Sequence, residues 1–287
     1  MLSKLELALL LLLGSALNAV VSAEVGCGSL EERLLFSTDT ATEPAEYSWM
    51  GILFQLSGAN AENTRCSVII VDATHVLTPA SCVRRFNGNA ELAAVRLGTW
   101  NETHPLDEEY ICNTRGFCVP GPVQHRVAEI KIHPQADKDT GDNDLAILRL
   151  SKPIKWSAYV SPICLQAASE PSSWISHNLH FGGFDHSSYL KGKGLAMAVS
   201  RQYCTQLSGS STPPPENQFC GYPIKRTRFY EGAGVLALNI EQDVPRNFYL
   251  AALLVKVINN KQTTVYIFQD LRPLRRWILD NTNFISK

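Results

Sequence analysis

Short hydrophobic runs, rather than long amphipathic stretches, dominate this chain. The runs are rich in β-branched and aromatic residues, and Gly, Pro, Asn and Asp separate them. Many short strands at this spacing predict an all-β sandwich or barrel. The expected strands are 49–56, 67–78, 127–133, 145–150, 195–200, 234–239, 249–258 and 263–269.

The pattern changes to helical spacing near the C-terminus. Leu271, Leu274 and Ile278 predict a helix over 271–281, with Pro273 in its first turn, where the missing N–H is harmless. Segment 208–215 reads Ser-Gly-Ser-Ser-Thr-Pro-Pro-Pro and predicts an exposed loop. The chain shows no internal repeat.

The first 23 residues have the pattern of a secretory signal peptide. Lys4 precedes an apolar run over 7–13, and Val21-Ser22-Ala23 supplies small residues at a cleavage site. An uncleaved signal anchor is the alternative, but the run is short for a span of about 20 residues. We therefore expect a signal peptide over 1–23 and a secreted, extracellular protein without a membrane span.

Composition and charge exclude several classes of function. The chain has 26 basic and 27 acidic residues and is 45% hydrophobic, which indicates a globular core and no nucleic-acid partner. No glycine-rich phosphate loop is present, and we expect no cofactor. His177 and His180 lack a carboxylate or cysteine at motif spacing, so a surface or loop role is favoured over a metal site.

Eight cysteines in a secreted chain indicate disulfide bonds, although their spacing alone does not decide the pairing. For the pair Cys112 and Cys118 zinc is the alternative, but no nearby cysteine pair completes four ligands.

An ordered set of motifs carries a family resemblance. Thr78-Pro79-Ala80-Ser81-Cys82 follows an apolar strand, and Asn143-Asp144-Leu145 and Pro162-Ile163-Cys164-Leu165 come later. In this order, from about Tyr47 to Ile278, the chain resembles the chymotrypsin-like (trypsin-like) serine proteases. The resemblance implies a double antiparallel β-barrel of six strands each, with a C-terminal helix and a cleft between the barrels. It divides the mature chain into an N-terminal segment over 24–46, tied by a disulfide, and a serine-protease-like domain over 47–287.

The resemblance also shows what the catalytic positions lack. The family's histidine base stands where this chain has Ser81, whose hydroxyl has no pKa near neutrality and cannot shuttle protons. Asp144 matches the orienting acid, or is simply a polar residue that bonds a loop. The nucleophile motif Gly-Asp-Ser-Gly-Gly-Pro best matches 230–235, which places Gly232 at the serine. We therefore predict a pseudoprotease and not an enzyme.

Pocket and activation positions are altered as well. Arg226 falls where trypsin-like enzymes carry an acid, Arg228 replaces a pocket cysteine, and Lys256 lies near the strand that holds substrate. Lys225-Arg226-Thr227-Arg228 is alternatively an exposed basic loop. The Arg33-Leu34 bond can be cut by a trypsin-like enzyme, but the glycine pair that follows in the family is missing. Tyr230 stands at an oxyanion-hole glycine, and Glu231 at the acid that accepts a new amino terminus.

The spacing of the cysteines resembles that of the arthropod clip-domain group. The resemblance implies the pairs Cys27–Cys164, Cys66–Cys82, Cys112–Cys118 and Cys204–Cys220. A clip domain needs six cysteines of its own, and only Cys27 precedes Cys66, so no clip domain is apparent. Asn101-Glu102-Thr103 is a sequon and predicts glycosylation at Asn101 in a surface loop, hence a glycoprotein.

These features lead to three hypotheses of function. The first is an inactive serine protease homologue that acts as a cofactor or regulator in an innate-immunity protease cascade of the melanisation or prophenoloxidase type. Its partners would be extracellular proteins, namely immune cascade proteases or complement-like factors. The second is a secreted module that binds a microbial surface ligand, and the third an active hydrolase with a relocated triad. Partner-binding loops are expected over 87–91, 101–122, 170–178 and 208–215.

Overall fold

The computed structural model describes most of the chain. The described residues are 26–58, 60–106, 108–112, 116–165, 170–224, 228–259 and 263–284. The predicted signal peptide (1–23) and the expected pocket residue Arg226 lie outside the described residues.

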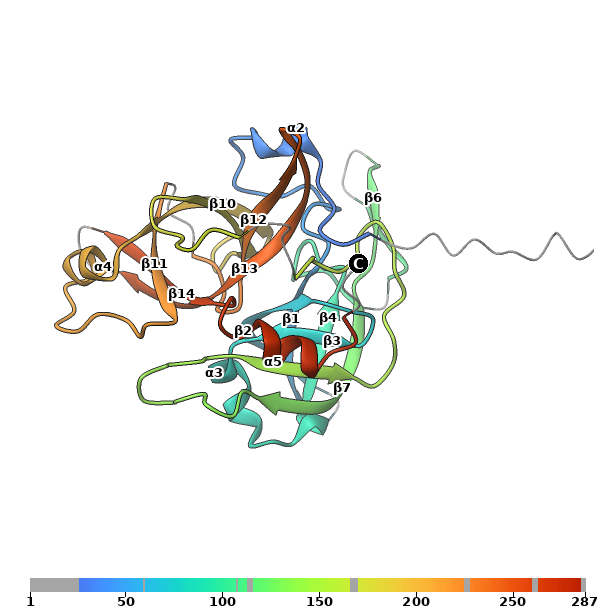
Figure 1. Ribbon diagram of the computed structural model, residues 1–287. Helices are drawn as coiled ribbons and strands as arrows, with labels where there is room; N and C mark the ends of the chain where they lie inside the picture. The colour runs from blue at the N-terminus through green and yellow to red at the C-terminus, as the bar shows by residue number, and fades with distance from the viewer. Residues whose placement is uncertain are drawn as a thin grey trace, which may run out of the picture.

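Two closed antiparallel barrels of six strands each form the molecule (Figure 1). The first has the strand order β1-β2-β3-β8-β7-β4 and the second the order β10-β11-β14-β13-β12-β9. The all-β class and the double barrel are therefore confirmed. The strands of the first barrel are β1 (Met50–Ser57), β2 (Asn60–Ile70), β3 (His75–Thr78), β4 (Ala93–Leu97), β7 (Val123–Ile132) and β8 (Ala146–Leu150). Those of the second are β9 (Asn178–Phe184), β10 (Lys191–Val199), β11 (Gln218–Pro223), β12 (Gly234–Glu241), β13 (Val244–Asn259) and β14 (Thr264–Asp270).

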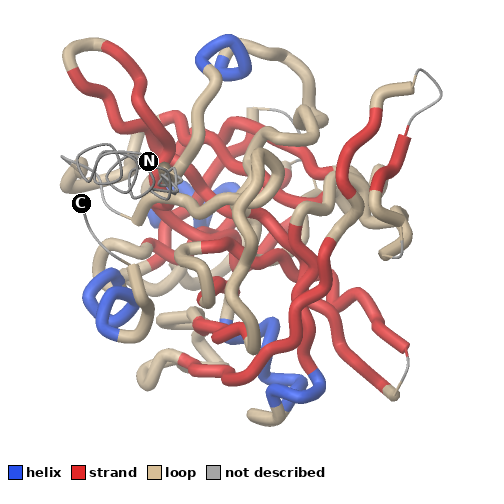
Figure 2. The backbone as a smooth tube through the Cα atoms, turned by 90° about the vertical axis from the view of Figure 1, so that its right-hand side faces the viewer, coloured by secondary structure: helices blue, strands red, loops and turns tan. Residues whose placement is uncertain are grey.

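Short elements lie at the periphery of the barrels, as Figure 2 shows. A separate two-stranded hairpin, β5 and β6, stands beside the first barrel. These elements are α2 (Glu32–Leu35), α3 (Ala80–Val83), α4 (Arg201–Ser208), α5 (Arg275–Asp280), the 3-10 turns η1 (Arg84–Phe86) and η2 (Ala90–Leu92), β5 (Tyr110–Cys112) and β6 (Cys118–Pro120). No described helix has the length and apolarity needed to cross a bilayer.

Each barrel encloses its own apolar core. The first is centred on fully buried residues such as Trp49, Ile52 and Leu148, and the second on Phe181 and Tyr266. β13 is long enough to contribute to both cores, because Phe248, Leu250 and Leu253 pack with the first barrel while Ala251, Ala252 and Leu254 pack with the second. Because successive side chains of a strand point to opposite faces, β13 connects the two cores.

Some expected boundaries were wrong. The run over 67–78 is not one strand, because Asp72 accepts the backbone N–H of Thr74 and of His75 and turns the chain between β2 and β3. The C-terminal helix is shorter than 271–281 and begins after Pro273, which lies in the turn before it. The stretch over 209–215 is a loop as expected, and Ser208 still belongs to α4.

All eight cysteines form disulfides, with the pairing that the resemblance implies. The pairs are Cys27–Cys164, Cys66–Cys82, Cys112–Cys118 and Cys204–Cys220, and no free cysteine remains. The first pair ties the N-terminal segment to the body, where Gly28 also exchanges backbone bonds with Pro162 and Phe248. Further on, Thr42 and the backbone around it pair with Lys191 and Lys193 at the start of β10.

Candidate functional site

The three degenerate catalytic positions lie where the two barrels meet. Ser81 is in the first turn of α3, Asp144 lies two residues before the start of β8, and Gly232 lies in the turn before β12. The first two belong to the first barrel and the third to the second. The barrels thus bring all three predicted positions to one cleft.

Ser81 and Asp144 form a direct pair. The Ser81 hydroxyl donates to Asp144 Oδ2 at 2.8 Å, and the Ser81 backbone N–H donates to Asp144 Oδ1 at 2.7 Å. The Asp144 N–H donates to Gln269 Oε1, which fixes the acid against the second barrel. Burial raises the pKa of Asp144, and the bonds from Ser81 oppose the shift. Asp144 therefore satisfies the first turn of α3, which is the loop-bonding role that the sequence left open.

Gly232 has no room for a side chain. Its φ is +85°, a left-handed conformation that glycine adopts without strain. A Cβ at this position would lie 2.2 Å from the carbonyl oxygen of Ser67 and 3.0 Å from Pro79. The backbone of this turn is itself tied to β2, because the Ser67 N–H donates to the Glu231 carbonyl oxygen at 2.7 Å. The position cannot carry a serine in this conformation.

The backbone donors at the oxyanion-hole positions are already bonded within the protein. In the family these donors are the N–H groups at the nucleophile and two residues before it. Here the Gly232 N–H donates to the Leu254 carbonyl at 2.7 Å, and the Tyr230 N–H donates to the Phe184 carbonyl at 3.0 Å. Neither donor is available to a substrate carbonyl in this geometry.

The side chain of Tyr230 holds this closed turn in place. It is fully buried, its hydroxyl donates to Glu102 Oε2 at 2.6 Å, and Arg65 donates to the same hydroxyl at 3.3 Å. The His186 ring packs edge-on against it, with centroids 4.5 Å apart. Burial, and then the bond to Glu102, raises the pKa of Tyr230. One signal of this network was visible in the sequence, namely a tyrosine at a glycine position of the family motif, but its bonding partners were not.

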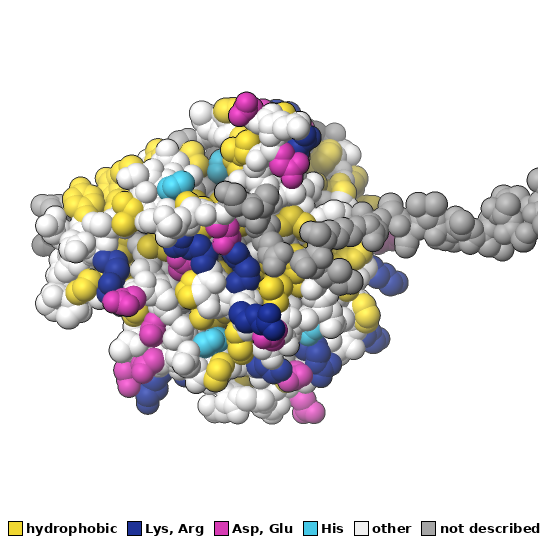
Figure 3. All heavy atoms as spheres, viewed as in Figure 1, with side chains coloured by type: hydrophobic (Ala, Val, Ile, Leu, Met, Phe, Trp, Pro, Cys, Tyr) yellow, Lys and Arg dark blue, Asp and Glu magenta, His cyan; other side chains and the backbone are white. Residues whose placement is uncertain are grey.

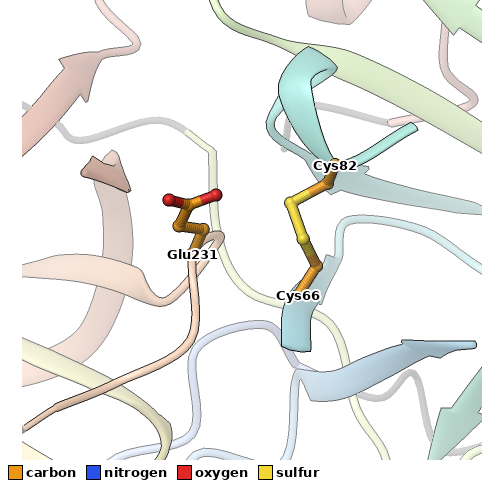
Figure 4. Close-up of side chains that lie close together, drawn as sticks. All are labelled: Cys66, Cys82 and Glu231. Atoms are coloured by element: carbon orange, nitrogen blue, oxygen red, sulfur yellow. A yellow bond between two sulfur atoms is a disulfide. The ribbon is translucent and has the colours of Figure 1, made fainter. Parts of the chain in front are cut away.

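Glu231 extends beside the disulfide Cys66–Cys82 (Figure 4). Among the described residues, this is the only group of potential ligand atoms close enough to share a metal ion. Both sulfur atoms are bonded to each other, so no thiolate is available and the group does not fit a metal site. Burial and then the negative charge of Asp144 raise the pKa of Glu231.

A groove remains next to the degenerate centre. Its cavity of about 320 Å³ lies between the connection before Asp144, the 208–215 loop and β13. Lys138 and Lys256 line it together with Asp139 and Asp144, so both signs of charge meet there. Lys256 thus lies at the cleft as expected, whereas Arg228 lies beside Asp185, whose carboxylate accepts its backbone N–H.

A histidine–aspartate pair, His75 with Asp72, lies away from the cleft. His75 Nδ1 is 2.8 Å from Asp72 Oδ2, and the Thr74 hydroxyl lies 3.1 Å from the same nitrogen. A triad needs the acid and the nucleophile on opposite ring nitrogens, so this arrangement does not relay a proton. Asp72 also accepts the Asn283 N–H and so anchors the C-terminal segment. The pair is structural.

The remaining residues named from the sequence lie outside the cleft. His180 lies in β9, and burial lowers its pKa to about 4. The ring of His177 packs edge-on against the ring of Trp174. Asn101 is half-buried, and its side-chain oxygen accepts the N–H and hydroxyl of the exposed Thr103. Arg33 lies in α2, where its guanidinium bonds the carboxylates of Glu31 and Glu43.

The two barrels and the cleft between them define the architecture of the chymotrypsin-like serine proteases. The family model for trypsin matches residues 39–225, and the chain belongs to this family. Drosophila Grass, a clip serine protease of the Toll pathway, has the same fold. Its crystal structure aligns with a TM-score of 0.69 over 91% of this chain and 75% of that chain, at 18% identity.

Similar sequences come from insects. Phenoloxidase-activating factor 3 of Holotrichia diomphalia is 30% identical over 58% of this chain and 47% of its own length. Melanization protease 1 of Drosophila melanogaster is 31% identical over 74% of this chain and 56% of its own length. CLIP domain-containing serine protease B10 of Anopheles gambiae is 25% identical over 60% of this chain and 48% of its own length. The chain thus spans about half the length of these relatives, and the family resemblance read from the motifs is confirmed.

Proposed function

We propose that this chain is a secreted, catalytically inactive trypsin homologue that regulates an extracellular immune protease cascade of the melanisation or prophenoloxidase type. The turn over 230–232 carries the proposal. It holds no nucleophile, its two backbone donors are bonded internally, and Ser67 occupies the space of a side chain at Gly232. Ser81 adds the loss of the general base. A removed signal peptide over 1–23 and the four disulfides fit secretion.

The names of similar proteins support the cascade assignment. They include a phenoloxidase-activating factor and a melanization protease, both from insects. A regulator without catalysis acts by binding, and loops around a rigid scaffold supply binding surfaces. In this proposal the segment over 24–46 is a tethered appendage of the domain over 47–287. The partners are cascade proteases or complement-like factors.

The test of inactivity uses the purified mature protein. We expect no cleavage of peptides with basic, aromatic or small residues before the scissile bond, and no labelling by a serine-directed fluorophosphonate. The double variant Ser81→His/Gly232→Ser should also lack peptidase activity, because the closed oxyanion positions remain. A stoichiometric adduct on the wild-type protein would show that catalysis has been retained.

The hairpin formed by β5 and β6 is the best candidate for the partner surface. It projects as a separate sheet, the Cys112–Cys118 bond closes it, and Tyr110 on it is 60% exposed. We expect the single substitution Tyr110→Ala, which keeps the disulfide, to weaken capture of cascade proteins from extracellular fluid after immune challenge, with little change in Tm. Ile240→Ser is the matched control, because Ile240 is 61% exposed on another hairpin. If both variants capture the same amount of cascade proteins, the hairpin is not the partner surface.

A further inference from the structure

A second hollow lies on the first barrel, and the degenerate catalytic positions do not line it. Its cavity of about 480 Å³ is enclosed by β4, the first residues of β7 and the connection that follows β8. This volume falls in the range of about 300–1,000 Å³ that is typical of small-ligand pockets. We call it the β7 cavity.

The walls of the β7 cavity are aliphatic. Leu97, Ile154 and Val160 are buried residues that face the hollow, and Val123 is 54% exposed at its side. An exposed valine beside buried aliphatic groups leaves apolar surface that an apolar ligand would remove from water. Such a lining favours a hydrocarbon group over a sugar or a bare ion.

The rim of the β7 cavity is basic. Arg126, Lys152 and Lys155 are exposed and line the hollow, and the lining contains no carboxylate. None of the ion pairs among the described residues involves these three cations. Figure 3 shows basic side chains beside hydrophobic ones along the right-hand edge of the first barrel. The groove beside Asp144 differs, because the carboxylates of Asp139 and Asp144 line it together with its two lysines.

We propose that the β7 cavity binds a small amphipathic anion, namely an apolar chain that carries one carboxylate or phosphate group. The chain lies against the aliphatic wall, and the head group pairs with Lys152, Lys155 and Arg126. Long basic side chains suit both parts, since their stems cover apolar surface while their charged ends reach the anion. The volume matches a small amphiphile rather than an extended protein segment. This binding is independent of the cleft and of catalysis.

The test is calorimetric titration of the purified mature protein with dodecanoate and dodecyl phosphate, each below its micelle concentration. We expect saturable binding of one molecule per chain. Dodecanol, which lacks the charge, and acetate or inorganic phosphate, which lack the chain, should bind at least 10-fold more weakly. The ratio of the two affinities distinguishes a fatty-acid head group from a phospholipid-like one. Binding of dodecanol as tight as that of dodecanoate, or unsaturable binding, would overturn the proposal.

Charge reversal locates the site. Lys152→Glu/Lys155→Glu should weaken dodecanoate binding at least 10-fold, while Lys138→Glu/Arg246→Glu changes the charge equally at exposed positions elsewhere and should leave it unchanged. Val123→Asp, a single exposed substitution at the wall, should weaken binding to a similar degree and serves if the double variant folds poorly. Equal affinity in the wild type and in all variants, or binding of an acidic peptide with none of either amphiphile, contradicts the assignment.

Discussion

The two barrels hold the predicted catalytic positions in different ways. On the first barrel the frame is intact, because Asp144 still receives two bonds from the residue at the position of the base. Only the side chain at Ser81 has changed. On the second barrel the backbone itself is involved, since the turn over 230–232 bonds to β2, β9 and β13, and the N–H groups of Tyr230 and Gly232 both have acceptors within the protein.

The two barrels thus differ in what would have to change: a single side chain on the first barrel, and a backbone turn on the second. A missing side chain on an exposed position can be replaced without moving the chain, and Ser81 is exposed. A closed turn is held by several bonds and by close packing, so restoring one side chain there meets the backbone of Ser67. The closed turn on the second barrel is therefore harder to alter than the side chain at Ser81.

The largest effect should come from Gly232→Ser. The added Cβ meets the Ser67 carbonyl and the left-handed φ is strained for serine, so we expect a loss of roughly 2–6 kcal/mol in the free energy of unfolding. Thermal denaturation should show a fall in Tm on the order of 10 °C.

A matched substitution separates strain from collision. Gly88→Ser has a similar φ of +79° but nothing within 4 Å of the added Cβ, so it should cost only about 1 kcal/mol. An equal loss of free energy of unfolding in the two variants would mean that the turn at Gly232 moves away from Ser67 easily. The turn on the second barrel would then be no more rigid than an open loop.

The next effect tests the intact half. Asp144→Ala removes the acceptor of the Ser81 N–H and hydroxyl and should destabilise the protein by about 2 kcal/mol. Asp139→Ala, an exposed neighbour in the same connection, should change stability by less than about 0.5 kcal/mol. Chemical denaturation of both variants measures the difference. If the two variants lose a similar amount of free energy of unfolding, the bonds from Ser81 to Asp144 do not stabilise the fold.

A smaller effect concerns pH. Burial, and then Asp144, raises the pKa of Glu231 in the folded state, so that state holds the proton more tightly than the unfolded chain. The contribution of Glu231 to the free energy of unfolding therefore rises as pH falls through the folded pKa toward the unfolded value of about 4.3. Glu231→Gln should remove this part of the slope, measured by denaturation between about pH 4 and 7. If Glu231→Gln leaves the pH dependence of the free energy of unfolding unchanged, the Glu231 carboxyl is exposed to water in the folded protein and its pKa is not raised.

The smallest effect on stability should be that of Ser81→His. The position is exposed and Asp144 is in place, so the free energy of unfolding should change by less than about 0.5 kcal/mol. The carboxylate should raise the pKa of the introduced imidazole, which nuclear magnetic resonance titration can follow. Peptide substrates should remain uncut. Turnover by this single variant would show that the second barrel had kept its function.

Much of the fold could be read from the sequence because its signals are local. Alternating apolar runs indicated most strands, and the ordered motifs implied the barrels and the cysteine pairs. Strands β4, β9 and β11 were not among the runs named from the sequence. For β4 the reason is that Ala93-Ala94 is a weak strand signal that is set by its pairing with β1 and β7. The break at Asp72 depends on side-chain bonds to the backbone, which the apolar pattern does not show.

In the candidate site, too, residue types could be read from the sequence, whereas contacts between remote segments could not. The residue types at Ser81 and Gly232 predict from the sequence that base and nucleophile are missing, and this stays a prediction. The occupied donors were not visible, because they depend on Phe184 and Leu254, which are remote in sequence and lie close only in the folded barrel. The β7 cavity was missed for a similar reason, since its basic rim and aliphatic wall come from three separate segments.

The bond Cys27–Cys164 has a consequence for what a cut after Arg33 would release. The piece that carries Cys27 would stay attached, and Gly28 would keep its backbone bonds to Pro162 and Phe248. Its effective concentration near the body would be in the millimolar range, set by the short tether. Cleavage would therefore leave both pieces in one molecule, and the mass of the unreduced molecule would rise only by the mass of the one water molecule that hydrolysis adds.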